Sequence, residues 1–231
     1  MDNSIEDKAI LNIDSDKILN TISAIKMELN ASADLSFKTL KSKESAALII
    51  DMIKGFAEEG ALSSERIHKL VPKIAELLSS SKDAKKVFIG DSHTKDSVEF
   101  LTYPIYAVSG TEESKIVEEL YQYFDENSVL IKKNSTNAMM TEALRAYLDC
   151  HSEIKNFIIV GDCTDICVLQ CALSLKAYFN ELNISKKVIV PYTYVDTYDL
   201  DVNHHEAELM NLFALYNMKL NGIELYRGLT F

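Results

Sequence analysis

Four apolar segments of the 231-residue chain end in side chains that could take part in chemistry. In chain order these are Asp51, then Asp91 with His93, then Lys132 with Lys133, and then Cys163 with Cys167. Because ligands of open α/β sheets bind beyond the carboxyl ends of the strands, we expect these side chains to share one edge of the sheet. An acid, an acid with an imidazole, a base and a thiol are side chains that acid–base and nucleophilic catalysis use.

Each of these residue types also has an ordinary structural role. A strand-end Asp often caps the next helix, a Lys is usually solvated, and a Cys is usually a small core residue. Cys167 differs because it lies near the start of a helix expected to begin at about Thr164, where free backbone N–H groups favour a thiolate. We therefore expect Cys167 to have a lowered pKa and to be the nucleophile, with Cys171 in the core and Cys150 structural.

Short apolar runs that alternate with longer helical patterns must position these side chains. The runs lack polar alternation, which indicates strands buried on both faces, and they span 46–51, 87–91, 129–132, 157–161, 188–191 and 223–226. A helical period is present in 64–80, 137–149, 165–182 and 205–220. The alternation predicts an α/β fold, a three-layer doubly wound sheet of about six mostly parallel strands with helices on both faces.

Residues 1–45 do not follow this alternation, so we assign them to an N-terminal helical extension and tether, with the main domain at 46–231. The extension carries apolar residues at helical spacing, namely Ile18, Ile22, Ile25 and Leu29. The polar segment 32–45 would then lead into the first strand. The extension is interpreted as a packing or oligomer contact, with a lid over the site as the alternative, and we expect a homo-oligomer.

The composition excludes several classes of function. A formal net charge of −11 disfavours nucleic acid and membrane partners. No two of the 7 glycines are two residues apart, and Gly55 and Gly60 are not followed by Lys, so we expect no nucleotide cofactor. Cys163, Cys167 and Cys171 line one helix face, which indicates reduced thiols. With no basic leader and no apolar run of about 18 residues, the sequence predicts a cytoplasmic protein.

Three motifs make the sequence similar to a known family. Asp-Met-x-x-x-Phe begins at Asp51, and Gly-x-x-Thr-Asp-x-Cys-Val begins at Gly161. A third motif begins at Lys133 with the family's spacing, although Asn and Met stand where the family has Ser and Phe. With these motifs, residues 46–226 resemble the isochorismatase-like cysteine hydrolase superfamily and, within it, the nicotinamidases.

The resemblance implies a role for each matching residue. Asp51, Lys133 and Cys167 would form the catalytic triad, and the backbone N–H groups of Cys163 and Cys167 would form an oxyanion hole. A cis peptide bond would join Asp162 to Cys163. The positions that would bind substrate are Phe56, Tyr106 and Asp162.

The resemblance also implies a metal site. Asp91, His93 and Glu99 match ligand positions, so zinc or another divalent ion would be the cofactor. Tyr106 stands where the family has a further His, which removes an imidazole ligand and leaves a metal-free site as the alternative. Two other histidines are expected to be exposed or to cap the last helix, namely His204 and His205.

The function implied by the resemblance is that of a cysteine-dependent amidohydrolase. Such an enzyme cleaves a small primary amide to an acid and ammonia through a thioester, and nicotinamide is the first substrate to test. One alternative is a metal-free hydrolase of the same family that acts on another small substrate. Another alternative is a catalytically silent binding or assembly protein on this fold.

Overall fold

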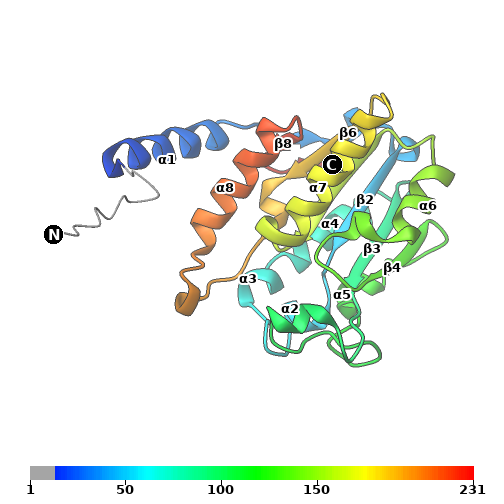
Figure 1. Ribbon diagram of the computed structural model, residues 1–231. Coiled ribbons are helices and arrows are strands. Elements are labelled where there is room, and N and C mark those ends of the chain that lie inside the picture. Colours follow the sequence, from blue (N-terminus) through cyan, green and yellow to red (C-terminus); the bar gives the residue numbers. More distant parts are fainter. Residues whose placement is uncertain (1–13) are drawn as a thin grey trace, which may run out of the picture.

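A computed structural model describes residues 14–231 and contains a central sheet of six parallel strands (Figure 1). The strand order is β4-β3-β2-β5-β6-β8, and the short β7 (Val195–Asp196) extends the pairing of β5. The bounds are β2 Ser45–Ile50, β3 Lys85–Asp91, β4 Ser128–Lys133, β5 Asn156–Asp162, β6 Lys187–Pro191 and β8 Glu224–Tyr226. These strands confirm the fold class that the apolar runs predict.

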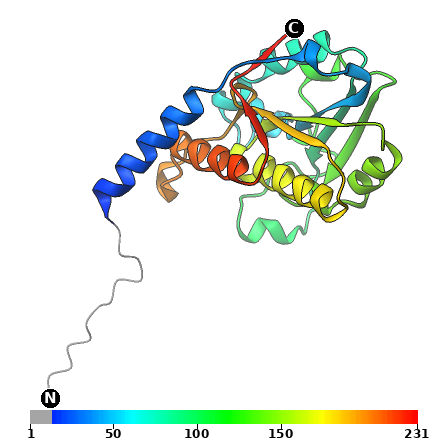
Figure 2. The same cartoon turned by 90° about the horizontal axis from the view of Figure 1, so that it is seen from above.

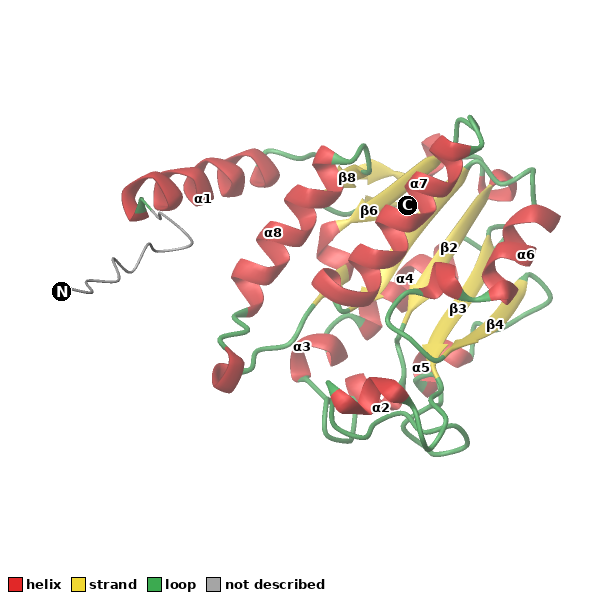
Figure 3. Ribbon diagram, in the orientation of Figure 1, coloured by secondary structure: helices red, strands yellow, loops and turns green. Residues whose placement is uncertain are grey.

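Helices cover both faces of the sheet because alternate side chains of each strand point to opposite sides. In β2, Leu48 and Ile50 pack against one set of helices, and Ala47 and Ile49 pack against the other. Figure 3 shows the helices and the strands of the sheet in separate colours. The first set is α6 (Glu142–Cys150), α7 (Leu169–Glu181) and α8 (Ala207–Leu220). The second is α2 (Lys54–Ala57), α3 (Glu65–His68), α4 (Val71–Ser80) and α5 (Glu118–Tyr121). Within residues 14–231, no helix has both the length and the apolar character to cross a bilayer.

The helical pattern predicted over 64–80 is two helices in the structure. α3 ends at His68 and α4 begins at Val71, with Pro72 in the first turn of α4. Proline has no N–H to donate and is favoured in the first turn, where that donor has no intrahelical partner. The apolar stripe is continuous across the break because Ile67, Leu70 and Ile74 are all buried.

The N-terminal extension packs on the domain through one end of its helix. In α1 (Ser15–Asn30), Ile25 and Leu29 are buried, whereas Ile18 is 40% exposed. Figure 2 shows α1 projecting beyond the rest of the molecule. The predicted tether contains β1 (Leu35–Ser36), which pairs in parallel with β9 (Leu229–Thr230) near the other end of the chain. The first 13 residues of the predicted extension lie outside the described residues.

The carboxyl ends of the strands meet at one edge, where the strand order reverses. The chain passes from β2 to β3 and β4 on one side and then to β5 and β6 on the other, so a crevice is expected between β2 and β5. Gly161 of β5 pairs with Ile50 of β2 and has φ +112°. A Cβ atom at this position would lie 2.0 Å from the carbonyl oxygen of Ile50, so only glycine fits.

We expect Gly161→Ala to destabilise the fold by about 3 kcal/mol, because it adds both a steric clash and an unfavourable φ. Gly110→Ala is the matched control. Gly110 also has a positive φ, of +88°, but a Cβ atom added there would have no neighbour within 4 Å. Its substitution should cost only about 1 kcal/mol. Urea denaturation followed by circular dichroism measures both, and equal losses would contradict the steric argument.

Candidate active site

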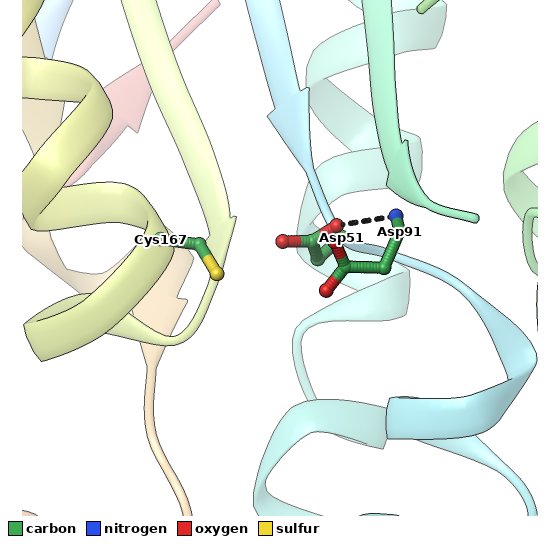
Figure 4. Close-up of side chains that lie close together, drawn as sticks. All are labelled: Asp51, Asp91 and Cys167. Carbon is green, nitrogen blue, oxygen red and sulfur yellow. Dashed lines mark hydrogen bonds between the residues drawn. The ribbon is translucent and has the colours of Figure 1, made fainter. Parts of the chain in front are cut away.

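The ammonium group of Lys133 is the centre of a buried polar cluster at this edge. Lys133 ends β4 beside Asp91 of β3, and its Nζ lies 2.7 Å from Asp51 Oδ2 and 2.6 Å from Asp91 Oδ1. Nζ is also 3.6 Å from the Sγ atom of Cys167. Figure 4 shows Asp51, Asp91 and Cys167 converging from three separate elements. The structure therefore brings together the three residues of the predicted triad and adds Asp91.

A left-handed backbone conformation directs Asp51 into the cluster. Asp51 follows β2 with φ +52°, an unusual conformation for a residue other than glycine. Its N–H donates to the carbonyl of Ile89 at 2.7 Å, and its Oδ1 accepts from the N–H of Asp91 at 2.9 Å, the dashed line in Figure 4. The second carboxylate oxygen is thereby left for Lys133.

Cys167 lies in a widened turn that precedes α7. Residues Thr164–Val168 form a π-helical turn in which the N–H of Val168 donates to the carbonyl of Cys163 at 3.1 Å. Such turns occur often at functional sites. The peptide bond between Asp162 and Cys163 is cis, as the resemblance implied.

The protonation state of the Cys167 thiol differs from the one expected from its position near the start of a helix. Burial raises the pKa of Cys167 well above its usual value, although Lys133 opposes this effect. The predicted lowering by the helix N-terminus is therefore wrong for the free protein, because the loss of water outweighs the favourable dipole. Burial, reinforced by Asp91, raises the pKa of Asp51 to about 7. Burial by itself would lower the pKa of Lys133. The negative charges of Asp51 and Asp91 have the larger, opposite effect, so the pKa of Lys133 lies well above its usual value.

The cluster opens onto a small cavity of about 20 Å³, which is room for one water molecule. Its walls include Phe56 and Tyr106, which the resemblance assigned to substrate binding. Asp162, the third such assignment, is not among the lining residues, and its carboxyl is buried beside the Cys163 thiol. The complete lining is Phe56, Leu62, Asp91, Tyr103, Tyr106, Thr136, Cys163, Ile166, Cys167 and Tyr198.

Several lining residues were not predicted. Leu62, Tyr103 and Tyr198 lie outside the three motifs, and Thr136 lies within the motif that begins at Lys133 but carried no assigned role. No residue of α1 lines the cavity, so in this chain the described part of the extension does not form a lid.

Two of the three predicted metal ligands lie together, because the buried Nε2 atom of His93 faces Asp91 and has no hydrogen-bond partner. In the described part of the chain, one group of His, Cys, Asp or Glu side chains has three ligand atoms within 4.8 Å of one another. That group is Asp51, Asp91 and Cys167, whose shared cation is the Lys133 ammonium. Glu99 does not join Asp91 and His93 in such a group.

Tyr106 also opposes a metal at this position. Its hydroxyl donates to Asp91 Oδ2 at 3.3 Å, and burial raises the pKa of the phenol, which keeps it a donor. Asp91 Oδ1 is bonded to Lys133, so both oxygens already have partners. The Nε2 atom of His93 faces the same Oδ1 at 3.6 Å. One imidazole and one fully engaged carboxylate do not fit a resident divalent ion.

Comparison with known proteins agrees with this geometry. The isochorismatase domain model matches residues 45–184.

The chain belongs to the isochorismatase family.

Within this family of hydrolases, the chain is 27% identical over 210 residues to nicotinamidase 1 of Arabidopsis thaliana, covering 80% of this chain and 86% of that one. The fold is shared with an L. infantum protein solved in complex with nicotinate, with a TM-score of 0.69, 17% identity, and coverage of 85% and 98% of the two chains. It is also shared with the pyrazinamidase of Pyrococcus horikoshii solved in complex with zinc, with a TM-score of 0.64, 24% identity, and coverage of 79% and 98%.

We expect Tyr106→His to create a divalent metal site, because it replaces a hydroxyl donor beside Asp91 with an imidazole ligand near His93. After dialysis against zinc and then buffer, elemental analysis should find about one equivalent in this variant and less than about 0.1 in the natural protein. Tyr106→Phe, which removes the hydroxyl without adding a ligand, is the control. Stoichiometric zinc in the natural protein would contradict the argument from its ligands.

Proposed function

We propose that this isochorismatase-family hydrolase cleaves a small primary amide to an acid and ammonia through a thioester on Cys167. The observation that carries the proposal is the buried Lys133 ammonium, which lies against Asp51, Asp91 and the Cys167 thiol. This arrangement provides a nucleophile, a base and a fixed positive charge in a buried site.

The first half of the reaction forms the thioester. The Asp51 carboxylate accepts the proton of Cys167 as Sγ bonds to the amide carbon, and the carbonyl oxygen becomes an oxyanion. Lys133 stabilises the ionised groups around it, and the backbone N–H groups of Cys163 and Cys167 are proposed to stabilise the oxyanion. The protonated Asp51 then returns its proton to the amide nitrogen, the carbon–nitrogen bond breaks, and ammonia leaves.

The second half regenerates the thiol. Asp51, again a carboxylate, takes a proton from a water molecule that attacks the thioester carbon. The carbon–sulfur bond breaks, the acid is released, and Cys167 recovers its proton from Asp51. A base with a pKa of about 7 is well suited to both proton transfers.

The walls of the cavity favour a flat, uncharged substrate. Phe56, Tyr103 and Tyr106 supply aromatic surface, with ring centroids 5.5 Å apart for Phe56 and Tyr106. Nicotinamide is the first amide to test, because a relative is named a nicotinamidase. Since the side chains do not fit a metal, we propose that the reaction proceeds without one, which keeps hydrolysis of another small amide as the second candidate.

We expect Cys167→Ala to abolish ammonia release from a panel of primary amides that includes nicotinamide, while leaving thermal stability nearly unchanged. Cys171→Ser is the matched control. Cys171 lies in α7, one turn beyond Cys167, and is fully buried in the core, so a hydroxyl there should destabilise the protein by about 1 to 3 kcal/mol without abolishing turnover. If Cys171→Ser were inactive and Cys167→Ala active, the nucleophile would be misassigned.

Iodoacetamide labelling distinguishes a silent protein from an enzyme with an untested substrate. A catalytic Cys167 should be alkylated stoichiometrically near neutral pH even if no amide of the panel is turned over. Failure of Cys167 to react under conditions that label exposed Cys150 would instead support a binding or assembly role.

We expect kcat/KM to rise with pH through about 7, because Asp51 must be ionised to accept the thiol proton and its pKa is raised to about 7. The negative charge of Asp91 contributes to this raised pKa. In Asp91→Asn, the rise of the remaining kcat/KM with pH should therefore occur at a pH about one unit lower. An acidic limb that stays in place in this variant would show that another group controls it.

A further inference from the structure

One wall of the cavity comes from a loop outside the sheet. The segment between β7 and α8 contains Tyr198, which lines the cavity, and the 3-10 turn Asp201–Asn203. The loop folds back on itself, because Leu200 and His205 exchange backbone hydrogen bonds of 2.9 and 3.1 Å. None of the three sequence motifs includes this loop. The sequence predicted that His205 is exposed or caps α8.

His205 connects this loop to the turn that carries the nucleophile. Its Nε2 lies 2.8 Å from Oδ2 of Asp165, which stands between Cys163 and Cys167 in the π-helical turn. Its Nδ1 lies 2.8 Å from the carbonyl oxygen of Tyr198. The imidazole and phenol rings are stacked, with centroids 4.1 Å apart and planes at 8°. The prediction for His205 is therefore wrong, since the ring is partly buried and bonded at both nitrogens.

Arg66 holds the opposite side of the same loop. Its Nε donates to the carbonyl of Thr197 at 3.1 Å, and its Nη2 donates to Asp196 at 2.8 Å and to Glu208 at 2.9 Å. Tyr198 is thus held between α3 on one side and the active-site turn on the other.

The size of the cavity requires a wall to move before an amide can enter. Tyr106 is buried and packs against the rings of Phe56, Phe100 and Tyr103, with centroids 5.5 to 6.3 Å apart, so it cannot move without disturbing the core. Tyr198 is half-buried, and among the described residues its ring stacks only on His205. Of these two walls, the one that His205 holds can therefore be displaced with the loss of fewer contacts.

We propose that Tyr198 limits the size of molecules that reach Cys167, and that His205 is the positioning residue that holds Tyr198 in place through Asp165. This role rests on the proposed function only in that Cys167 is the reactive group. Small primary amides would pass when the loop opens slightly, whereas bulkier carbonyl compounds would need the His205 to Asp165 contact to break.

The test compares the alkylation rates of Cys167 by iodoacetamide and by the bulkier N-phenylmaleimide, measured on peptides by mass spectrometry. No substrate needs to be known. In Tyr198→Ala and His205→Ala, the rate with N-phenylmaleimide should rise about tenfold, while the rate with iodoacetamide changes less than about threefold. His205→Gln retains an N–H that can reach Asp165 and should restore most of the selectivity.

Three internal controls separate positioning from a general loosening of the fold. His204→Asn changes the exposed neighbouring histidine, which has φ +59°, to a residue that tolerates that conformation, and it should leave both rates unchanged. Cys150 is exposed and should react equally in every variant, and the fully buried Cys171 should stay unlabelled. Labelling of Cys171 would indicate partial unfolding of the variant. His205→Asn, which shortens the side chain, would then replace His205→Ala in the comparison.

An unchanged ratio of the two rates in Tyr198→Ala, with Cys167 reactive, would overturn the inference and leave the proposed function intact. If the ratio of the two alkylation rates changed in Tyr198→Ala but not in the His205 variants, His205 would not be the residue that positions Tyr198. A Cys167 that reacts with neither reagent in any protein would contradict the proposed function instead.

Discussion

Lys133 places a positive charge where no water reaches it, and the surrounding structure must compensate for the lost hydration. An isolated buried ammonium is strongly unfavourable, so it requires carboxylates at hydrogen-bonding distance. Asp51 and Asp91 provide them from the ends of β2 and β3, and Lys133 itself ends β4. The register of three adjacent strands is thereby linked to one ion cluster. A shift of any strand by one residue would turn a charged side chain toward the apolar layer.

The same cluster explains why the thiol and the carboxylate have unusual protonation. Two carboxylates share one ammonium, so they cannot both be fully stabilised as anions, and Asp51 is the one whose pKa rises. A neutral thiol beside a base of nearly neutral pKa stores the proton within the site until a substrate arrives. Tyr106 adds a neutral hydrogen bond to Asp91 at a position where the family resemblance would place an imidazole.

The strands were predictable because they depend on local sequence, and the convergence of Asp51, Lys133 and Cys167 was predictable because their motifs resemble those of the family. Buried parallel strands appear as continuous apolar runs, and topology brings their ends together whatever the connecting lengths. The position of Asp91 within the Lys133 cluster was not predictable, because a strand-end carboxylate can face a metal, a helix or a lysine with the same sequence pattern. The prediction of a lowered pKa for the Cys167 thiol was wrong because burial raises this pKa by more than the helix dipole lowers it. Tyr198 and His205 were missed because the path of an irregular loop leaves no periodic signal.

The pairing of β1 with β9 joins segments almost two hundred positions apart, at Leu35 and Leu229. During synthesis β1 emerges before every strand of the central sheet, whereas β9 follows the last of them. The edge of β1 therefore remains open while the strands of the central sheet are made, and its pairing with β9 can form only after β8 has emerged. A fragment that begins at Ser45 would keep the matched domain but leave β9 without its partner strand.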